Sequence, residues 1–131
     1  MKKIKNIERI TSIYSAWRPS DIAFIKSLEW SVQNLVIVFY CQLRKRVNRW
    51  PDTSKDFFEV SIIFKNISSF RLDFNGSELH QVSGFDILDI SDNGLENISF
   101  QIEDYENDSI NFVCEEVEIK GVSNPDRILV P

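Results

Sequence analysis

The side chains best able to take part in chemistry are carboxylates gathered near one predicted hairpin. They are Glu103, Asp104, Glu106, Asp108, Glu115 and Glu116. Two carboxylates can act as general acid and general base when burial separates their pKa values. In this chain they occupy a predicted turn and outward strand positions, where water surrounds them. The pattern therefore favours a binding surface over a catalytic site, and we expect the protein not to be an enzyme.

The acidic hairpin is suited to contact lysine and arginine side chains of another protein, because complementary charges steer and orient association. Tyr105 lies within the hairpin and would supply an aromatic anchor. The residues expected to bind a partner are Glu103, Tyr105, Glu106, Asp108, Glu115 and Glu116.

The remaining chemical candidates are weaker. His80 is the single histidine, and no G-x-S-x-G or comparable nucleophile motif surrounds it. A zinc site built from His80, Cys41 and Cys114 would lack a fourth ligand. The segment 89–94 partly matches a calcium loop, but position twelve is Phe100 where a glutamate is needed, so we predict a turn. The sequence indicates neither metal nor cofactor, and it leaves open whether the two cysteines are close.

One basic segment, residues 44–50, carries four cationic side chains and ends in Trp50. Such a segment could contact phosphates while the indole stacks on a base. It is short, however, and no nucleic-acid motif surrounds it. The pattern favours a solvated hairpin tip, and we do not expect a nucleic-acid partner.

Charge is unevenly distributed along the chain, whose net charge is −5. Residues 1–56 contain 11 basic and 5 acidic side chains, whereas residues 57–131 contain 4 basic and 15 acidic ones. The two halves could be complementary neighbours within one sheet. Alternatively, the acidic half forms a surface that attracts a basic partner.

Apolar and polar residues alternate along most of the chain, which is the period-2 pattern of strands with one buried face. The clearest stretch is 57–74, in which every second residue from Phe58 to Phe64 is apolar. The run 35–41 is apolar on both faces, which indicates a central strand covered on two sides. At residues 115 and 116 the alternation of apolar and polar residues shifts by one position, as it would at a β-bulge. The strands are predicted within 21–30, 35–41, 57–65, 70–74, 81–91, 98–103 and 110–119.

The N-terminal segment, residues 3–17, has the pattern of an amphipathic helix. Its apolar residues recur at steps of three and four, and Pro19 would end the helix. The predicted fold class is therefore α+β, with one N-terminal helix packed on a curved, mainly antiparallel sheet of about seven strands.

The length of 131 residues favours a single domain, which we place at residues 1–121. Residues 122–131 have no periodic pattern, and we expect a loosely held tail. No apolar segment has the length of a signal sequence or of a membrane span, which takes roughly 20 residues. We therefore expect a cytoplasmic protein that does not engage a membrane.

The order of these elements resembles that of small bacterial immunity proteins of polymorphic toxin systems. The resemblance covers most of residues 7–119 and rests on IERITSIYSAW, PSDIAFIKSLEW, FFEVSIIFKNISSFRLDF, GFDILDIS and ISFQIEDYENDSINFVCEEVEI. Relatives tend to carry a His-Asp pair after the helix, where this chain has Ser20 and Asp21. The resemblance implies a non-enzymatic cytoplasmic protein that binds and neutralises a cognate toxin. From the acidic surface we expect this toxin to be basic.

Two other functions are open on the sequence alone. The concave face of the sheet could hold a small ligand, although its inward residues are almost all apolar. Alternatively, Val36, Val38 and Tyr40 could form a self-association face in place of a helix contact. The chain would then be a homodimer, whereas the other hypotheses fit a monomer.

Overall fold

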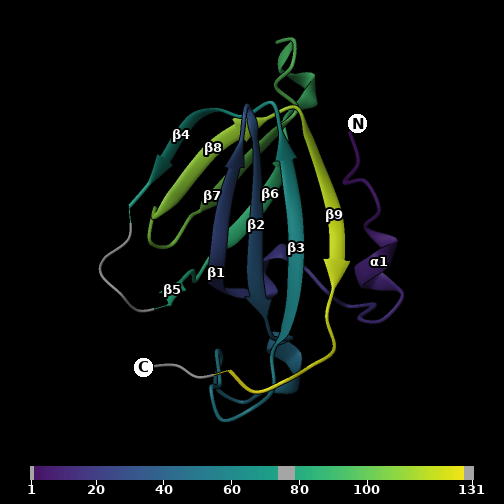
Figure 1. Cartoon of the computed structure of the whole chain (residues 1–131), viewed down its shortest axis with the longest axis vertical. Helices are drawn as coiled ribbons and strands as arrows, with labels where there is room; N and C mark the ends of the chain where they lie inside the picture. Colours follow the sequence, from purple (N-terminus) through teal and green to yellow (C-terminus); the bar gives the residue numbers. More distant parts are fainter. Residues whose placement is uncertain (1, 74–78, 129–131) are drawn as a thin grey trace.

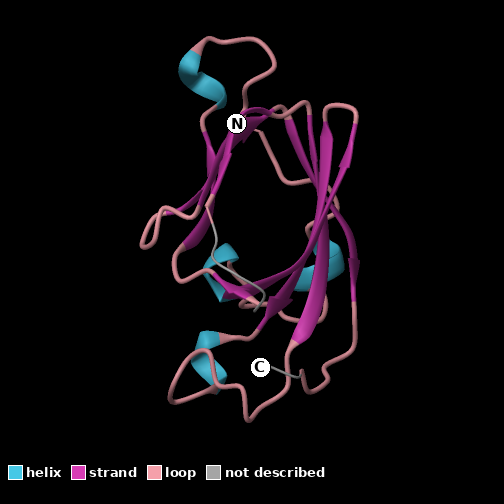
Figure 2. Cartoon of the chain, turned by 60° about the vertical axis from the view of Figure 1, so that its left-hand side comes forward, coloured by secondary structure: helices cyan, strands magenta, loops and turns pink. Residues whose placement is uncertain are grey.

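The computed structural model describes residues 2–73 and 79–128, which form two antiparallel sheets packed face to face (Figure 1, Figure 2). The first sheet has the order β5 (His80–Gln81), β1 (Ile22–Ser31), β2 (Asn34–Cys41), β3 (Phe58–Lys65) and β9 (Glu116–Val122). The second has the order β4 (Ser68–Leu72), β8 (Ile110–Cys114), β7 (Phe100–Asp104) and β6 (Phe85–Asp89). The described helical segments are α1 (Glu8–Thr11), η1 (Pro19–Asp21), η2 (Arg44–Arg46) and η3 (Ser91–Asn93).

The core lies between the two sheets because each central strand turns its apolar residues to the same side. Burial alternates strictly along β2, β3, β7 and β8, as the period of a strand requires. Aromatic rings join the layers: Phe64 of β3 lies 5.1 Å from Phe112 of β8, and Phe39 of β2 lies 5.0 Å from Phe85 of β6, between ring centroids. The fold is thus a β-sandwich with an aromatic core.

The chain changes sheet between β3 and β4, between β4 and β5, between β5 and β6 and between β8 and β9, and the sequence pattern revealed none of these crossings. Between β3 and β4 the link is Asn66 and Ile67, and Asn66 has a φ of 58°. Between β5 and β6 the link is residues 82–84, inside the stretch 81–91 that was predicted to hold one strand. Between β8 and β9 it is the single residue Glu115. The predicted bulge at residues 115 and 116 is this last crossing. Because the buried face reverses when a strand changes sheet, the apolar phase shifts there by one residue.

The predicted single sheet of about seven strands is therefore wrong, although its mainly antiparallel character is confirmed. The described residues contain nine strands in two sheets. A period-2 pattern identifies strands with one buried face, but it does not say which sheet each strand joins. Strand β2 is central in its sheet, as predicted, but only one of its faces is buried, so the predicted cover on two sides is wrong. Phe74, at the end of one predicted strand, lies outside the described residues.

The predicted N-terminal helix over residues 3–17 is also wrong. Only Glu8–Thr11 is α-helical, and no side chain caps its first turn. Asn6 has a φ of 60°, while Lys5 pairs with Glu118 at the free edge of β9. Short helices are marginal without tertiary support, and here the strand edge competes for the backbone. The apolar residues Ile10, Tyr14 and Trp17 are nevertheless buried, so the pattern identified core residues correctly.

The segment predicted to be a loose tail is anchored as far as the structure describes it. Phe57 and Asp126 exchange two backbone hydrogen bonds of 2.8 Å. Ile128 packs on a second apolar cluster formed by Ala23, Phe24 and Phe57 on the outer side of the five-stranded sheet. Residues 129–131 lie outside the described residues. No helix in the described part of the chain has the length and apolar content to cross a membrane.

One turn carries backbone strain that a substitution should relieve. Val32, in the β1–β2 turn, is 97% exposed and has a φ of 57°, a conformation that is unfavourable for β-branched residues. We expect Val32→Gly to raise the free energy of unfolding by about 0.5–1 kcal/mol, measured by urea denaturation. The adjacent Gln33→Gly is the control and should destabilise, because Gln33 is not among the residues with positive φ. A destabilising Val32→Gly would contradict the strained turn.

Candidate functional site

The structure divides the six predicted partner-binding residues between two ends of strand β8. Glu103, Tyr105, Glu106 and Asp108 lie at or near the β7–β8 turn, whereas Glu115 and Glu116 lie at the β8–β9 junction (Figure 1). The five residues of β8 separate these groups by roughly 17 Å. The six residues therefore do not form one surface.

A buried carboxylate holds the β7–β8 turn in place. Asp104 is 1% exposed, and its two oxygens accept hydrogen bonds from the Gly84 backbone N–H at 2.9 Å and from Ser109 Oγ at 2.7 Å. Its carbonyl accepts a further bond from the Asp108 backbone N–H at 2.7 Å. The sequence did not distinguish Asp104 from its exposed neighbours. Its role is to position the turn, which fixes where Tyr105 and Glu106 emerge.

Two carboxylates lie directly opposite each other on the outer side of the four-stranded sheet. Asp86 of β6 pairs in register with Glu103 of β7, while their neighbours Phe85 and Asp104 face inward. Like charges in directly opposed positions destabilise a sheet. Neither carboxylate forms an ion pair with any residue that the structure describes. Asp86 Oδ1 accepts a hydrogen bond from the Ile87 backbone N–H at 2.9 Å, but no described cation offsets the repulsion between the two carboxylates.

Tyr105 and Glu106 extend this surface at the turn. Tyr105 is 60% exposed, and its backbone N–H donates to the Gly84 carbonyl at 2.9 Å. A Cβ added at Gly84 would lie 2.9 Å from the Tyr105 ring and from Glu106 Cγ, so both side chains rest over the glycine. We call Asp86, Glu103, Tyr105 and Glu106 the acidic face. Asp86 was missed from sequence, although the alternation of residues 84–91 placed it outward.

The acidic face adjoins a shallow pocket of about 280 Å³. Arg18, Phe85, Asp86 and Tyr105 are among its lining residues. Arg18 forms no ion pair with Asp86 in this structure. The pocket gives the acidic face a recess whose lining is partly polar and partly aromatic, where a side chain of a partner could be inserted.

The other predicted carboxylates have partners within the protein. Asp108 pairs with Arg71 of β4 at 2.5 Å. Glu115 accepts a hydrogen bond from Asn66 Nδ2 at 3.0 Å. Glu116 pairs with Lys5 at 3.0 Å, and this hydrogen bond is the main cause that lowers the pKa of Glu116. These three residues are thus less available to an external cation than Glu103 and Glu106.

The two cysteines lie at opposite ends of the sandwich, because β2 ends at Cys41 near η2 and β8 ends at Cys114 beside β9 (Figure 1). Both are free and buried. Burial raises the pKa of the Cys41 thiol, and it raises the pKa of Cys114 to about 12. Such thiols are poor nucleophiles at neutral pH, so their role in this fold is packing.

The half-buried His80 should make stability depend on pH. Burial lowers its pKa below the ordinary 6.5, while Asp104 and Asp73 oppose the shift. The unfolded chain then binds the proton more readily, so stability falls as pH drops below about 6.5. We expect the midpoint of urea unfolding to be lower at pH 5.5 than at pH 7.5, and His80→Gln to remove most of the difference. Equal pH dependence in both proteins would contradict this role.

The basic segment 44–50 is folded into the protein at two points. Trp50 Nε1 donates to the Gln42 carbonyl at 2.7 Å, and the Arg44 guanidinium lies 3.6 Å from the centre of the Trp50 ring. Arg44 also donates to the carbonyl groups of Ser20 at 2.7 Å and Ser83 at 2.8 Å. Trp50 therefore already carries a cation of this protein on its ring.

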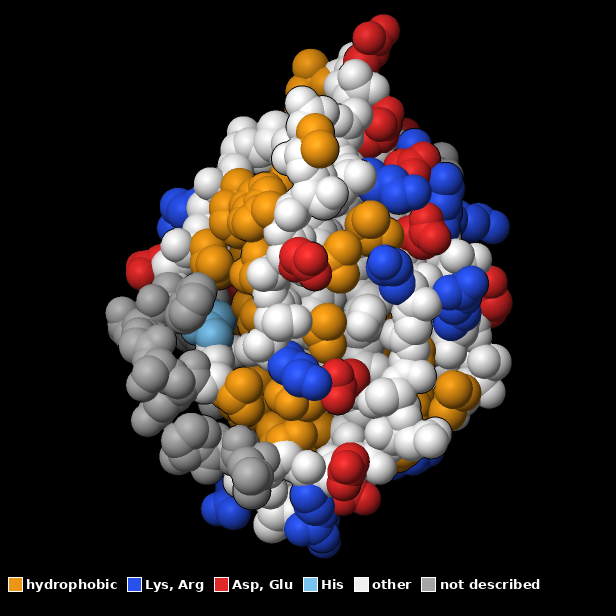
Figure 3. All heavy atoms as spheres, in the orientation of Figure 1, with side chains coloured by type: hydrophobic (Ala, Val, Ile, Leu, Met, Phe, Trp, Pro, Cys, Tyr) orange, Lys and Arg blue, Asp and Glu red, His pale blue; other side chains and the backbone are white. Residues whose placement is uncertain are grey.

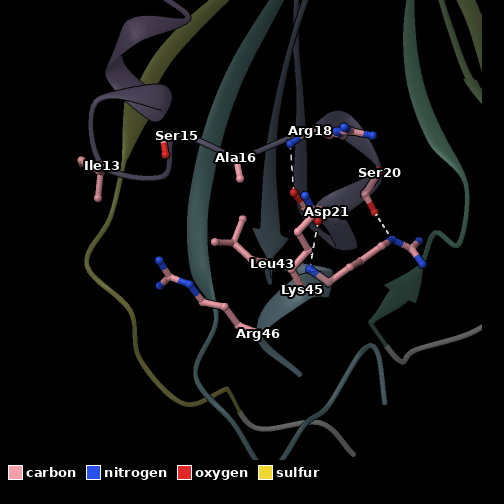
Figure 4. Close-up of a pocket in the computed structure, with 10 residues that line it drawn as sticks. Ile13, Ser15, Ala16, Arg18, Ser20, Asp21, Leu43, Lys45 and Arg46 are labelled. Carbon is pink, nitrogen blue, oxygen red and sulfur yellow. Dashed lines mark hydrogen bonds between the residues drawn. The ribbon is translucent and has the colours of Figure 1, made fainter. Parts of the chain in front are cut away.

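Asp21 ties this segment to the turn that follows the N-terminal region. It is 5% exposed, and its oxygens accept hydrogen bonds from the backbone N–H groups of Arg18 at 2.9 Å and Arg44 at 3.0 Å. The two chain segments enclose a pocket of about 230 Å³ between them (Figure 4). We call this the basic pocket, and its principal lining residues are Ala16, Arg18, Asp21, Leu43, Lys45 and Arg46.

The outer side of the five-stranded sheet is the surface that the self-association hypothesis would use. Val36, Val38 and Tyr40 are partly exposed there, and none of the described helical segments covers them (Figure 1). Figure 3 shows that apolar patches on this side are interrupted by charged groups, among which Lys26 and Glu59 pair at 3.0 Å. The concave inner face, by contrast, is filled by the core. A ligand site would have to lie elsewhere, as the basic pocket does.

Comparisons with known proteins add no relative to this description. No protein-family model matches the chain, and neither the curated proteins nor the solved structures contain a match.

Proposed function

We propose that this chain is a non-enzymatic, cytoplasmic binding protein of the immunity type, which neutralises a basic cognate toxin through its acidic face. The observation that carries the proposal is the opposed pair Asp86 and Glu103, which has no basic partner among the described residues. The resemblance to immunity proteins of polymorphic toxin systems supports the same class of function.

The chemistry of the acidic face explains how it would bind. A lysine or arginine placed between Asp86 and Glu103 would remove their mutual repulsion and gain charge-assisted hydrogen bonds. Binding therefore gains free energy that the unbound protein does not have. Glu106 adds attraction at the edge of the site, and Tyr105 offers an aromatic surface for the apolar stem of the same cation. The negative field would also accelerate encounter with a basic toxin.

Charge reversal on the acidic face is the test of this proposal. The variant Asp86→Lys with Glu103→Lys keeps a like-charge pair across the two strands, so the cost to strand pairing is matched. We expect it to raise the dissociation constant for the partner by about 100-fold or more. The partner is first captured with the tagged wild-type protein from cells that encode the toxin, and the dissociation constants are then measured by calorimetry.

A second double variant, Asp92→Lys with Glu96→Lys, serves as the matched control. It makes the same change in net charge at exposed positions in and after η3. We expect its affinity to stay within a few-fold of that of the wild type. Equal losses of affinity in both double variants would show that only the net charge of the protein matters. Unchanged affinity in the variant of Asp86 and Glu103 would reject the acidic face as the binding surface.

A further inference from the structure

The basic pocket has an excess of positive charge that the protein does not neutralise. Arg18, Lys45 and Arg46 line it and are exposed, and no ion pair joins any of them to a described carboxylate. The only carboxylate in its lining is Asp21, whose oxygens already accept two backbone hydrogen bonds. Arg44 is committed to carbonyl groups and to Trp50. Arg46 lies 5.9 Å from the centre of the Tyr14 ring, a contact that uses no N–H donor. Arg18, Lys45 and Arg46 therefore keep their hydrogen-bond donors for a ligand.

The pocket is also bounded by apolar groups, which distinguishes it from a solvated charge cluster. Leu43, which is 7% exposed, and Ala16, which is exposed, are both among its lining residues. Figure 4 shows these two side chains between Arg46 on one side and Arg18 on the other. Arg18 extends away from Ala16 in this view, and an exposed arginine changes rotamer within nanoseconds. The arrangement suits a ligand with a small apolar part and a strongly anionic end.

The number of free cations indicates which anion fits. A carboxylate has one charge and two oxygens, so it would leave most of the three cations uncompensated. A phosphate monoester carries between about −1.5 and −2 charges near neutral pH and offers three terminal oxygens. Arginine binds such oxygens through two parallel hydrogen bonds, while lysine acts as a point charge. We infer that the basic pocket binds a small organic phosphate, gripped by Arg46 and Lys45 with Arg18 closing on it.

The size of the pocket limits the ligand. Its volume of about 230 Å³ lies below the roughly 300–1,000 Å³ of pockets that hold drug-sized molecules. A phosphate ester with one small ring or a short chain fits this range, whereas an oligonucleotide would have to extend far beyond the pocket. Arg18 lines both this pocket and the recess beside the acidic face, whereas Lys45 and Arg46 line the basic pocket and not that recess. A variant of Arg46 therefore tests the basic pocket without changing the acidic face.

Calorimetric titration with phenyl phosphate at low salt tests the inference, with benzoate and inorganic phosphate as comparison ligands. We expect phenyl phosphate to bind most tightly, and Arg46→Gln to weaken it by about tenfold or more through loss of charge-assisted hydrogen bonds. Lys120→Gln is the matched control, because Lys120 is an exposed cation on β9 outside the pocket lining. It should leave the affinity unchanged.

Four results would overturn the inference. Absence of phenyl phosphate binding at millimolar concentration would reject the pocket as an anion site. Benzoate binding as tightly as phenyl phosphate would reject the preference for phosphate. If Lys120→Gln weakened binding as much as Arg46→Gln does, the affinity would depend on the overall charge of the protein and not on the pocket. A short RNA or DNA oligomer that binds more than about 100-fold more tightly than phenyl phosphate would assign the cations to nucleic acid.

Discussion

Replacement of Phe112 by alanine should lower the free energy of unfolding by about 4 kcal/mol, because it deletes a large ring from the centre of the sandwich. Phe112 is fully buried, and its ring lies 5.1 Å from Phe64 on the opposite sheet and 5.4 Å from Phe70, between centroids. The loss combines the transfer free energy of the ring with a cavity that two facing sheets cannot close. Equilibrium unfolding in urea measures it.

The adjacent Val113→Ala is the control for this prediction. Val113 lies on the same strand but points to the outer side of the four-stranded sheet. Its truncation should cost only about 0.5–1 kcal/mol, mainly through lower β-propensity. Similar losses in both variants would contradict the assignment of inward and outward faces, and with it the outward position of Glu103 on the neighbouring strand.

Asp21→Ala is expected to destabilise the protein by about 2 kcal/mol, since it removes the carboxylate that accepts hydrogen bonds from two partly buried backbone donors. These donors are the N–H groups of Arg18 and Arg44, which belong to segments far apart in the sequence. The variant should also abolish phosphate ester binding, because the walls of the basic pocket are no longer held together. Urea unfolding and calorimetry provide the two measurements.

Asp21→Asn separates the geometry of this link from its charge. The asparagine keeps one oxygen acceptor, so we expect roughly half of the destabilisation seen with alanine. A loss below about 1 kcal/mol for Asp21→Ala would show that the two segments are held by other contacts. The basic pocket would then be independent of Asp21.

The strands were predictable from sequence because burial on one face imposes a period that survives in the residues themselves. The distribution of strands between two sheets was not, since the crossing at Glu115 looks the same in sequence as a bulge within one sheet. The N-terminal segment shows a related limit. Its apolar spacing correctly identified Ile10, Tyr14 and Trp17 as buried, but pairing of Lys5 with the edge of β9 replaced most of the helix.

The candidate sites were predictable only in part, for physical reasons that differ by residue. Composition identified the acidic hairpin, but it did not show which carboxylates have partners within the protein. Asp104 accepts a hydrogen bond from Gly84, and Glu116 pairs with Lys5, and both partners come from distant segments of the chain. Asp86 belongs to the acidic face only through its register with Glu103. The basic pocket likewise requires Arg18 to meet the 44–46 segment, which no local pattern encodes.

The most direct test of the binding surface is hydrogen–deuterium exchange of the protein alone and in complex with its captured partner. If the acidic face binds, amides of β6, β7 and the 105–109 turn should exchange more slowly in the complex, and the β8–β9 junction should be unchanged. Protection confined to that junction or to the five-stranded sheet would contradict the proposal and move the binding surface away from Asp86 and Glu103.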